Sequence, residues 1–567
     1  MKKVLMVAMV LAALLWGYFV SQQTTETAPP TRLDYVPEDT LLFSAQFTPF
    51  PIKDYVDAIP EVQKRKPVEL ILWLHEEEDP QVRFFLSLLD RYMTALKDGQ
   101  TFIDTFGFPD KITSYFYTLG AIPVLKLDIV NPERFWALLD SVEANSGLKH
   151  IERTLDDLSY RAYPVVDFGM QMDLIFAIEN GVLTVTLSGD LSSPTLLKTA
   201  LGRLRADSPL SATDKVPKMI SEHGLLADGL GFVNHQTLIK GLTTTDGNLL
   251  ARQLTQLFEQ YRHDPLQELR TSVCQEELTT IAENWPHTVL GYRALDVNDN
   301  KITMDLRTVI ESHNGTILGA LNQLRGFLPA YTQAEDGLFT FGLGLDSKEL
   351  APALTKVWNE LLTPKYRCSV LHELQGDIQR HNPMMVSMFT SMANGVKGIA
   401  MSVQDYEVNL TGQLMRITSL DGLVSLSAEE PLALFNMVKV FDPTLAQLPL
   451  KDDGSAIELN SYLPLPSHLG VKIYMAIKGQ HLVVFSGEKG KQLSQELAKE
   501  KLSSNGLVTL STDYGKMAAP LMNVLELNDL RLSPERDDLK EYDMKIKLQL
   551  DVTAKGIQVD SSTQMGK

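Results

Sequence analysis

Alternating apolar and polar positions predict a chain built of short strands and helices. Residues 174–178 and 183–187 have the composition of strands and flank Asn180 and Gly181, a pair that favours a tight hairpin turn. Residues 473–485 repeat this strand–turn–strand pattern, and a helix-like segment follows each hairpin. Since hairpins join antiparallel neighbours, the pattern predicts an α+β fold with antiparallel sheet.

Two prolines mark positions where helices are expected to begin. Pro132 follows the apolar run 124–129, and Pro431 follows the apolar run 423–427. Proline is tolerated best at the first position of a helix, because the amide hydrogen that it lacks would have no partner there. We therefore expect both prolines to start helices.

Similar landmarks recur in the same order along the two halves of the chain. Residues 38–44 resemble residues 335–341, and the proline-led helices and the hairpins follow at nearly constant spacing. This order predicts a tandem duplication of a strand–helix and antiparallel hairpin–helix unit. The first repeat half would cover 34–330 and the shorter second half 331–567. Two unrelated α+β domains built from common parts are the alternative.

The start of the chain has the pattern of an export signal. Lys2 and Lys3 precede an uncharged apolar run at 4–20, close to the length of one transmembrane helix. A signal anchor over 1–21 and a cleaved signal peptide both fit, although no Ala-x-Ala cleavage site is evident. In either case the lysines stay cytoplasmic and the body is exported, in a Gram-negative cell to the periplasm. Residues 22–33 are expected to form a polar tether.

Composition and charge narrow the class of protein. The chain has 44% hydrophobic and 22% charged residues, which is a globular composition and excludes wholesale disorder, a coiled coil and a multi-span membrane protein. Its 52 Lys and Arg against 71 Asp and Glu give a net charge of −19. Because phosphate binding needs clustered cations, this balance argues against a nucleic-acid partner.

The two cysteines fit an exported protein. Cys274 and Cys368 are the only ones in the chain, and an even count in an oxidising compartment predicts a disulfide. Such a bridge would tie the helical end of the first half to the first helical segment of the second. Two separate buried thiols are the alternative.

The search for catalytic and metal-binding motifs predicts no catalytic residue, no metal site and no cofactor. The chain lacks GxSxG, GxxxxGK[ST], GxGxxG and HExxH patterns. Residues 296–300 begin like a calcium loop, but Lys301 and Arg307 occupy the positions that need Gly and Glu, so a polar hairpin turn is expected. The histidines, His287 among them, are scattered without metal-ligand spacing.

Met384, Met388 and Met392 recur at helical spacing and would form one stripe. Packed core is one interpretation of this stripe. An adaptable apolar binding face for a peptide or another client is a second, because methionine surfaces repack easily. A Cu(I) site of thioether ligands, assisted by His381, is a third.

Residues 36–43, with the sequence Val-Pro-Glu-Asp-Thr-Leu-Leu-Phe, follow shortly after the signal anchor. This strand entry resembles that of a family of exported bacterial envelope proteins whose folded part begins Leu-Pro-x-Asp-Thr, with Val here in place of Leu. The resemblance implies an envelope protein and no particular chemistry.

These observations together predict a non-enzymatic binding or scaffold protein of the cell envelope. A single N-terminal anchor would hold it at the inner membrane with its body in the periplasm, where its partner would be an envelope protein or an apolar client. A periplasmic chaperone or carrier for apolar clients is one alternative. An envelope hydrolase without a recognisable motif is the other.

Overall fold

The structure is a computed structural model of the full chain. It describes residues 31–67, 70, 73, 76–167, 170–259, 264–334, 337–381, 383, 393, 395–411, 414–463, 469–527 and 543–566. The predicted anchor at 1–21, most of the predicted tether and the methionine stripe lie outside these residues. Within the described part of the chain, no helix combines the length and the apolar character needed to cross a membrane.

The predicted fold class, a tandem-duplicated α+β fold, is wrong. The described strands are assigned to one large sheet of 19 strands, and every strand pairing with a described register is antiparallel. Hairpin and helix signals are local in sequence, whereas the choice of partner along a strand edge is not. Local landmarks therefore identified individual strands without identifying the sheet that they build.

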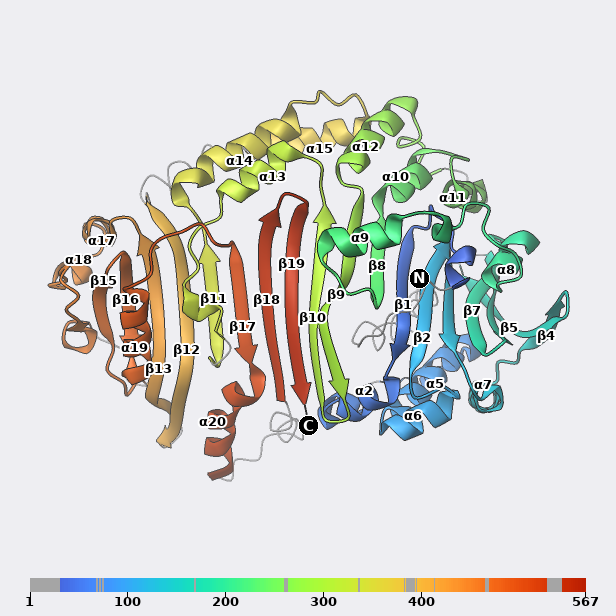
Figure 1. Cartoon of the computed structure of the whole chain (residues 1–567), viewed down its shortest axis with the longest axis horizontal. Coiled ribbons are helices and arrows are strands. Elements are labelled where there is room, and N and C mark those ends of the chain that lie inside the picture. Colours follow the sequence, from blue (N-terminus) through green and yellow to red (C-terminus); the bar gives the residue numbers. More distant parts are fainter. Residues whose placement is uncertain are drawn as a thin grey trace. The chain divides into compact units, whose positions relative to one another are not determined.

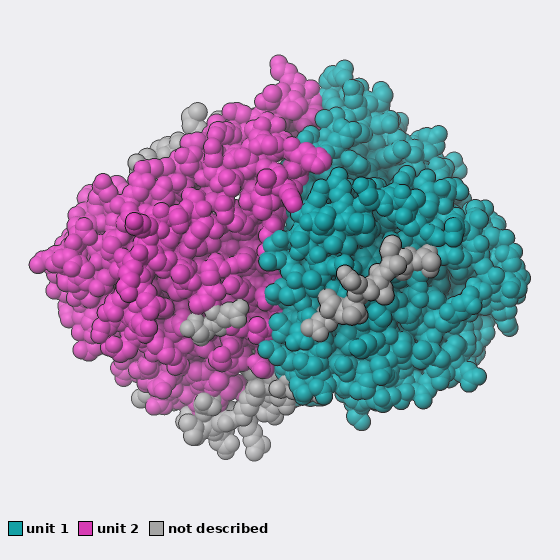
Figure 2. Space-filling model, viewed as in Figure 1, with its two compact units in different colours: residues 1–311, 367–370, 565–567 teal, residues 312–366, 371–564 magenta. Residues whose placement is uncertain are grey.

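Contacts divide the chain into two compact units (Figure 2). Unit 1 comprises Met1–Glu311, Arg367–Val370 and Met565–Lys567, and unit 2 comprises Ser312–Tyr366 and Leu371–Gln564. Unit 1 is therefore assembled from three separate stretches of sequence.

The strands of unit 1 follow the order β4–β5–β6–β7–β3–β2–β1–β8–β9–β10 (Figure 1). Their bounds are β1 (Leu42–Phe50), β2 (Ile112–Leu119), β3 (Ile122–Asp128), β4 (Ile151–Leu155), β5 (Leu158–Asp167), β6 (Met170–Glu179), β7 (Val182–Gly189), β8 (Gly229–Asn234), β9 (His287–Asn298) and β10 (Lys301–Glu311). The expected turn at Asn180 and Gly181 joins β6 to β7, with positive φ at both residues. Strand β1 pairs with β2 on one edge and with β8 on the other, where Leu42 lies opposite the distant Val233.

Several helices of unit 1 begin at a residue whose side chain caps them. Asn131 accepts a hydrogen bond from the amide of Arg134, and Pro132 is the first residue of α7, as expected. The α-helices are α2 (Ile52–Ala58), α3 (Glu61–Lys64), α5 (Pro80–Ala95), α6 (Gly99–Phe106), α7 (Pro132–Ser146), α8 (Pro194–Ala200), α9 (Lys215–His223), α10 (His235–Thr243), α11 (Leu249–Glu259) and α12 (Ser272–Asn284). Two 3-10 turns, η1 (Thr31–Tyr35) and η2 (Leu210–Ala212), complete the unit.

Both faces of the unit 1 sheet are buried. One face carries a core cluster that includes Tyr115, Tyr117, Val124 and Phe232. Between the other face and helices α5, α6 and α7 lies a cavity of about 30 Å³ with an almost wholly apolar lining that includes Phe176. A dry apolar cavity of this size is a packing gap and offers little to orient a ligand.

The strands of unit 2 follow the order β14–β15–β16–β13–β12–β11–β17–β18–β19 (Figure 1). Their bounds are β11 (Phe339–Gly344), β12 (Val396–Thr411), β13 (Leu414–Ala428), β14 (Ile457–Glu458), β15 (Tyr474–Lys478), β16 (His481–Ser486), β17 (Val508–Asp513), β18 (Asp543–Thr553) and β19 (Gly556–Gly566).

The described part of unit 2 contains seven α-helices. They are α13 (Gly315–Gln323), α14 (Ser347–Leu362), α15 (Ser369–Arg380), α17 (Pro431–Val438), α18 (Pro443–Ala446), α19 (Gly487–Leu497) and α20 (Tyr514–Leu527), with 3-10 turns η3 (Ala330–Thr332) and η4 (Leu459–Ser461). Pro431 is the first residue of α17, as expected. Helix α19 packs on β13 and β16 over a cluster that includes Leu423, Phe485 and Leu497.

Candidate functional site

Cys274 and Cys368 form a disulfide within unit 1, with sulfur atoms 2.02 Å apart. The backbone amides of Arg367 and Cys368 each donate a hydrogen bond of 3.0 Å to the carboxylate of Glu277, which is on the same helix as Cys274. The bridge and these hydrogen bonds hold the short segment Arg367–Val370 against α12. Met384, Met388 and Met392 lie outside the described residues, so the apolar face stays a prediction.

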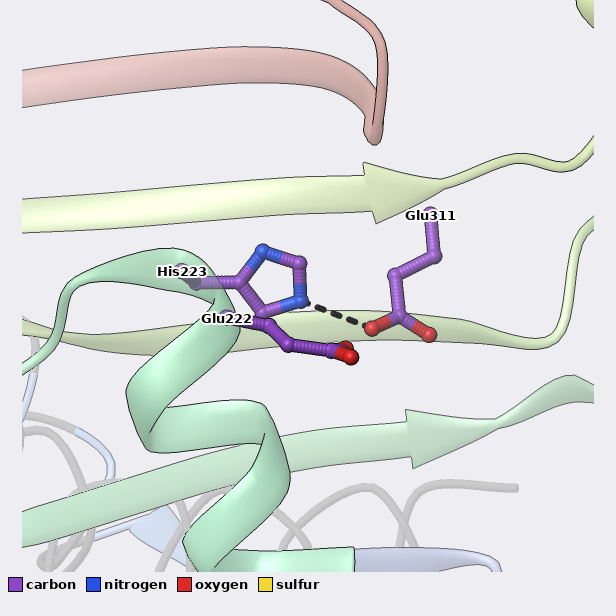
Figure 3. Close-up of side chains that lie close together, drawn as sticks. All are labelled: Glu222, His223 and Glu311. Atoms are coloured by element: carbon purple, nitrogen blue, oxygen red, sulfur yellow. Dashed lines mark hydrogen bonds and ion pairs between the residues drawn. The ribbon is translucent and has the colours of Figure 1, made fainter.

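The structure brings together three side chains of unit 1 that are far apart in sequence: His223, His287 and Glu311. His223 Nε2 lies 2.7 Å from Glu311 Oε1 (Figure 3), and His287 Nδ1 lies 2.8 Å from Glu311 Oε2. His223 is 5% exposed. Both oxygens of one carboxylate are thus occupied by imidazoles.

Local structure fixes the position of each member of this cluster. His287 is the first residue of β9 and Glu311 the last of β10, and the register that pairs Thr288 with Ile310 sets them side by side at the end of the hairpin. His223 ends helix α9, where its backbone carbonyl accepts a hydrogen bond of 3.0 Å from Arg307 Nη1.

Burial by itself would raise the pKa of Glu311. Hydrogen bonds from His223 and His287 outweigh burial and hold that pKa down to about 2. Glu311 is therefore a carboxylate at every physiological pH, and it supplies a fixed negative charge in a half-buried position.

Glu222 adds a second carboxylate beside this pair. One ligand atom each from Glu222, His223 and Glu311 lie within 4.8 Å of one another, and Glu222 is exposed to solvent (Figure 3). Imidazole nitrogen and carboxylate oxygen are both common metal ligands, so these three residues could hold a divalent cation.

Sequence reasoning missed this cluster because it searched for ligands at short spacing. His223 and Glu311 are 88 residues apart and meet only when α9 packs against the β9–β10 hairpin. A usable signal did exist. The polar hairpin turn expected at 296–300 makes its two flanking segments antiparallel neighbours, which brings the regions of His287 and Glu311 together. The register shift between Asp305 and Leu306 then sets which residues stand opposite each other.

Unit 2 contains an open groove of about 590 Å³, here called the lysine groove. Its walls come from β13, from the segments 454–456 and 470–472, from β15, from the end of β16 and from α19. The rings of Tyr474 and Phe485 stack within the lining at 5.6 Å between centroids. It is lined by Thr418, Ser419, Leu420, Gly454, Ala456, Gly470, Val471, Lys472, Tyr474, Lys478, Phe485, Ser486, Gly487, Glu488, Lys491, Ser494 and Gln495.

The charge of the lysine groove is opposite to that of the whole chain. Lys472, Lys478 and Lys491 line it together with one anion, Glu488, whereas the chain carries a net charge of −19. Lys478 is fixed by a hydrogen bond of 2.6 Å to the carbonyl of Gly454. The two other ammonium groups lie 3.3 Å from exposed or half-exposed carboxylates, an arrangement that holds them weakly. The groove therefore favours an anionic ligand.

A strand edge also faces the lysine groove. Strand β13 pairs with β16 only from Gly422 to Ser427, while its residues Thr418–Leu420 line the groove. Among the described strands, none pairs with β13 on this side at Thr418–Leu420. Next to them, Ile417 is bridged to Leu469, and its carbonyl accepts a hydrogen bond of 2.8 Å from the amide of Gly470. Among the described residues, the edge that a ligand could reach is therefore the short stretch Thr418–Leu420.

No known protein family, curated protein or solved structure matches this chain. Function must therefore be argued from the two sites themselves.

Proposed function

We propose that the chain is a membrane-anchored, exported binding protein of the cell envelope, and that its lysine groove holds an extended acidic segment of another envelope protein. The observation that carries the proposal is the groove itself: about 590 Å³, three lysines and, at Thr418–Leu420, a short stretch of strand edge beside which no described strand lies. The apolar run after Lys2 and Lys3 supports export and anchoring. The disulfide supports an oxidising compartment.

Each part of the groove suits an extended peptide. Backbone groups at Thr418–Leu420 can add a strand from the partner, in which main-chain hydrogen bonds supply affinity. The half-buried ring of Tyr474, stacked on the buried Phe485, offers apolar surface for an inward-facing side chain. The lysines attract acidic side chains and speed association. A lipid chain would leave the strand edge without hydrogen bonds, so a peptide fits better.

The described residues that line the groove favour binding over catalysis. They include hydroxyl groups and lysines, but no histidine, and Glu488 is their single carboxylate. General acid–base chemistry needs a positioned base with a partner that sets its pKa. We therefore propose a non-enzymatic role for this groove.

Reversing two groove charges is expected to abolish partner capture. The full chain, crosslinked in native membranes and purified, would be compared with a Lys472→Glu/Lys491→Glu variant. Recovery of the partner should fall about tenfold or more, because two attractive charges become repulsive. A Lys97→Glu/Lys365→Glu variant has the same net charge with both changes at exposed positions outside the groove, and it should capture the partner normally. Equal recovery by the two variants would contradict the proposal.

A direct binding measurement removes the dependence on crosslinking. Fluorescence anisotropy with a labelled peptide of alternating Glu and Val should show binding that weakens as salt screens the charges, over a Debye length of about 8 Å at physiological ionic strength. A peptide of alternating Lys and Val tests charge preference. Equal affinity for both peptides would rule out an acidic partner.

A further inference from the structure

We propose that unit 1 binds a divalent transition metal, with Zn²⁺ as the best-fitting ion, through His223 Nε2 and the carboxylates of Glu222 and Glu311. One ligand atom from each residue lies within 4.8 Å of the others (Figure 3). This site is separate from the lysine groove, which belongs to unit 2, and the inference does not depend on the function proposed for that groove.

The spacing of the ligand atoms fits zinc after small side-chain movements. Tetrahedral zinc holds nitrogen and oxygen at about 2.0–2.2 Å, so neighbouring ligand atoms lie roughly 3.3–3.5 Å apart. His223 Nε2 and Glu311 Oε1 are now 2.7 Å apart, as hydrogen-bond partners, and must separate by less than about 1 Å. Glu222 is exposed, so its carboxylate can move toward the metal without repacking the core.

Zinc would replace the hydrogen that His223 and Glu311 now share. An imidazole binds metal through a nitrogen lone pair, so the ring must carry its hydrogen on Nδ1 when Nε2 is the ligand. Zinc binding therefore replaces the hydrogen bond between His223 and Glu311 with three bonds from the metal to its protein ligands.

Neighbouring groups hold two of the ligands in orientation. His287 Nδ1, 2.8 Å from Glu311 Oε2, can keep its hydrogen bond while Glu311 Oε1 binds the ion. Arg307 Nη1 fixes the backbone of His223 through a hydrogen bond of 3.0 Å to its carbonyl. Outer partners of this kind fix the orientation of metal ligands and raise affinity.

The ligand types select the class of ion. One imidazole and two carboxylates include no sulfur, which disfavours Cu(I). The nitrogen ligand disfavours Ca²⁺ and Mg²⁺, which prefer oxygen alone. Three protein ligands leave a fourth position on a tetrahedral zinc ion, which water can fill.

Calorimetric titration with ZnCl₂ tests the site. The full chain, purified without a histidine tag and treated with EDTA, is expected to bind one zinc ion. Loss of an outer partner typically weakens metal affinity about 10- to 100-fold. Glu222→Gln removes a direct ligand, so zinc affinity should fall by at least that much. Glu276→Gln makes the same change at another exposed glutamate of unit 1 and should leave affinity unchanged. Because Glu222 is exposed, its variant is expected to fold.

X-ray absorption of the zinc-loaded chain provides a second readout. We expect a first shell of nitrogen and oxygen only, with the multiple-scattering signature of one imidazole, which His223→Gln should remove. Absence of zinc binding, equal affinity in the Glu222→Gln and Glu276→Gln variants, or sulfur in the first shell would each overturn the proposal. Displacement of zinc by equimolar Mg²⁺ or Ca²⁺ would overturn the choice of ion.

Discussion

Replacing Cys274 and Cys368 together with alanine is expected to lower the free energy of unfolding by about 4–5 kcal/mol. The disulfide joins residues 94 apart in sequence, and closing so long a loop removes much conformational entropy from the unfolded chain. Both cysteines are 1% exposed, so alanine adds only small gaps in packing. Calorimetric unfolding, with and without a reducing agent, measures the loss.

Reduction supplies the matched control for this disulfide experiment. The reducing agent should lower the unfolding temperature of the native chain to that of the double variant, and it should not affect the variant. If the native chain and the variant unfold at the same temperature under oxidising conditions, loop closure contributes nothing measurable to stability.

Replacing Lys126 with methionine is expected to stabilise the protein by a few kcal/mol below pH 7. Lys126 lies on β3, is 5% exposed, and has a hydrogen bond of 3.1 Å to Thr184 Oγ1. Burial lowers the pKa of its ammonium group to about 7, and the charge of Arg32 acts in the same direction, against a weaker opposite effect of Glu179. Methionine fills a similar volume without a charge to bury.

The pH dependence of this stabilisation follows from the two pKa values of Lys126. Below pH 7 the lysine is protonated in both states, so folding carries the full cost of burying its charge. Between pH 7 and about 10.5 the unfolded chain holds a proton that the folded chain has released, so the native protein gains stability as pH rises. The advantage of Lys126→Met should therefore shrink across this window.

Guanidinium unfolding of both proteins at pH 6, 7, 8 and 9 measures that difference, and other titrating groups cancel between them. A Lys97→Met variant, at an exposed position, should behave like the native chain at every pH. If Lys126→Met is less stable than the native chain at pH 6, the ammonium group is stabilised by its surroundings and the expectation is wrong.

Local chemistry allowed much of the secondary structure to be predicted. Pro132 and Pro431 do start helices, because the proline ring suits the first helical position. Asn180 does form a hairpin turn with the glycine that follows it, because both residues accept positive φ. The polar run at 296–300 does hold a hairpin turn, at Asp299 and Asn300 between β9 and β10, and Asn298 Oδ1 accepts hydrogen bonds there from the amides of Asn300 and Lys301.

Partners distant in sequence were not predictable by the same means. Nothing in the alternation of β1 indicates that Leu42 will lie opposite Val233, because a strand offers the same backbone groups to any edge. The prediction of the fold class was wrong for this reason. The cluster at Glu311 was not predicted for the same reason, since His223 reaches that carboxylate only through the packing of α9.

The composition of unit 1 has a consequence for biosynthesis. A ribosome makes Cys274 94 residues before Cys368, and residues 565–566, which also belong to unit 1, are made later still. Unit 1 therefore cannot be completed while the chain is still emerging, although most of its sequence comes first. Until Cys368 has been made, Cys274 has no second cysteine within its own chain. Premature oxidation can link it only to another molecule, so nascent chains that crowd together at the translocation site risk covalent dimers.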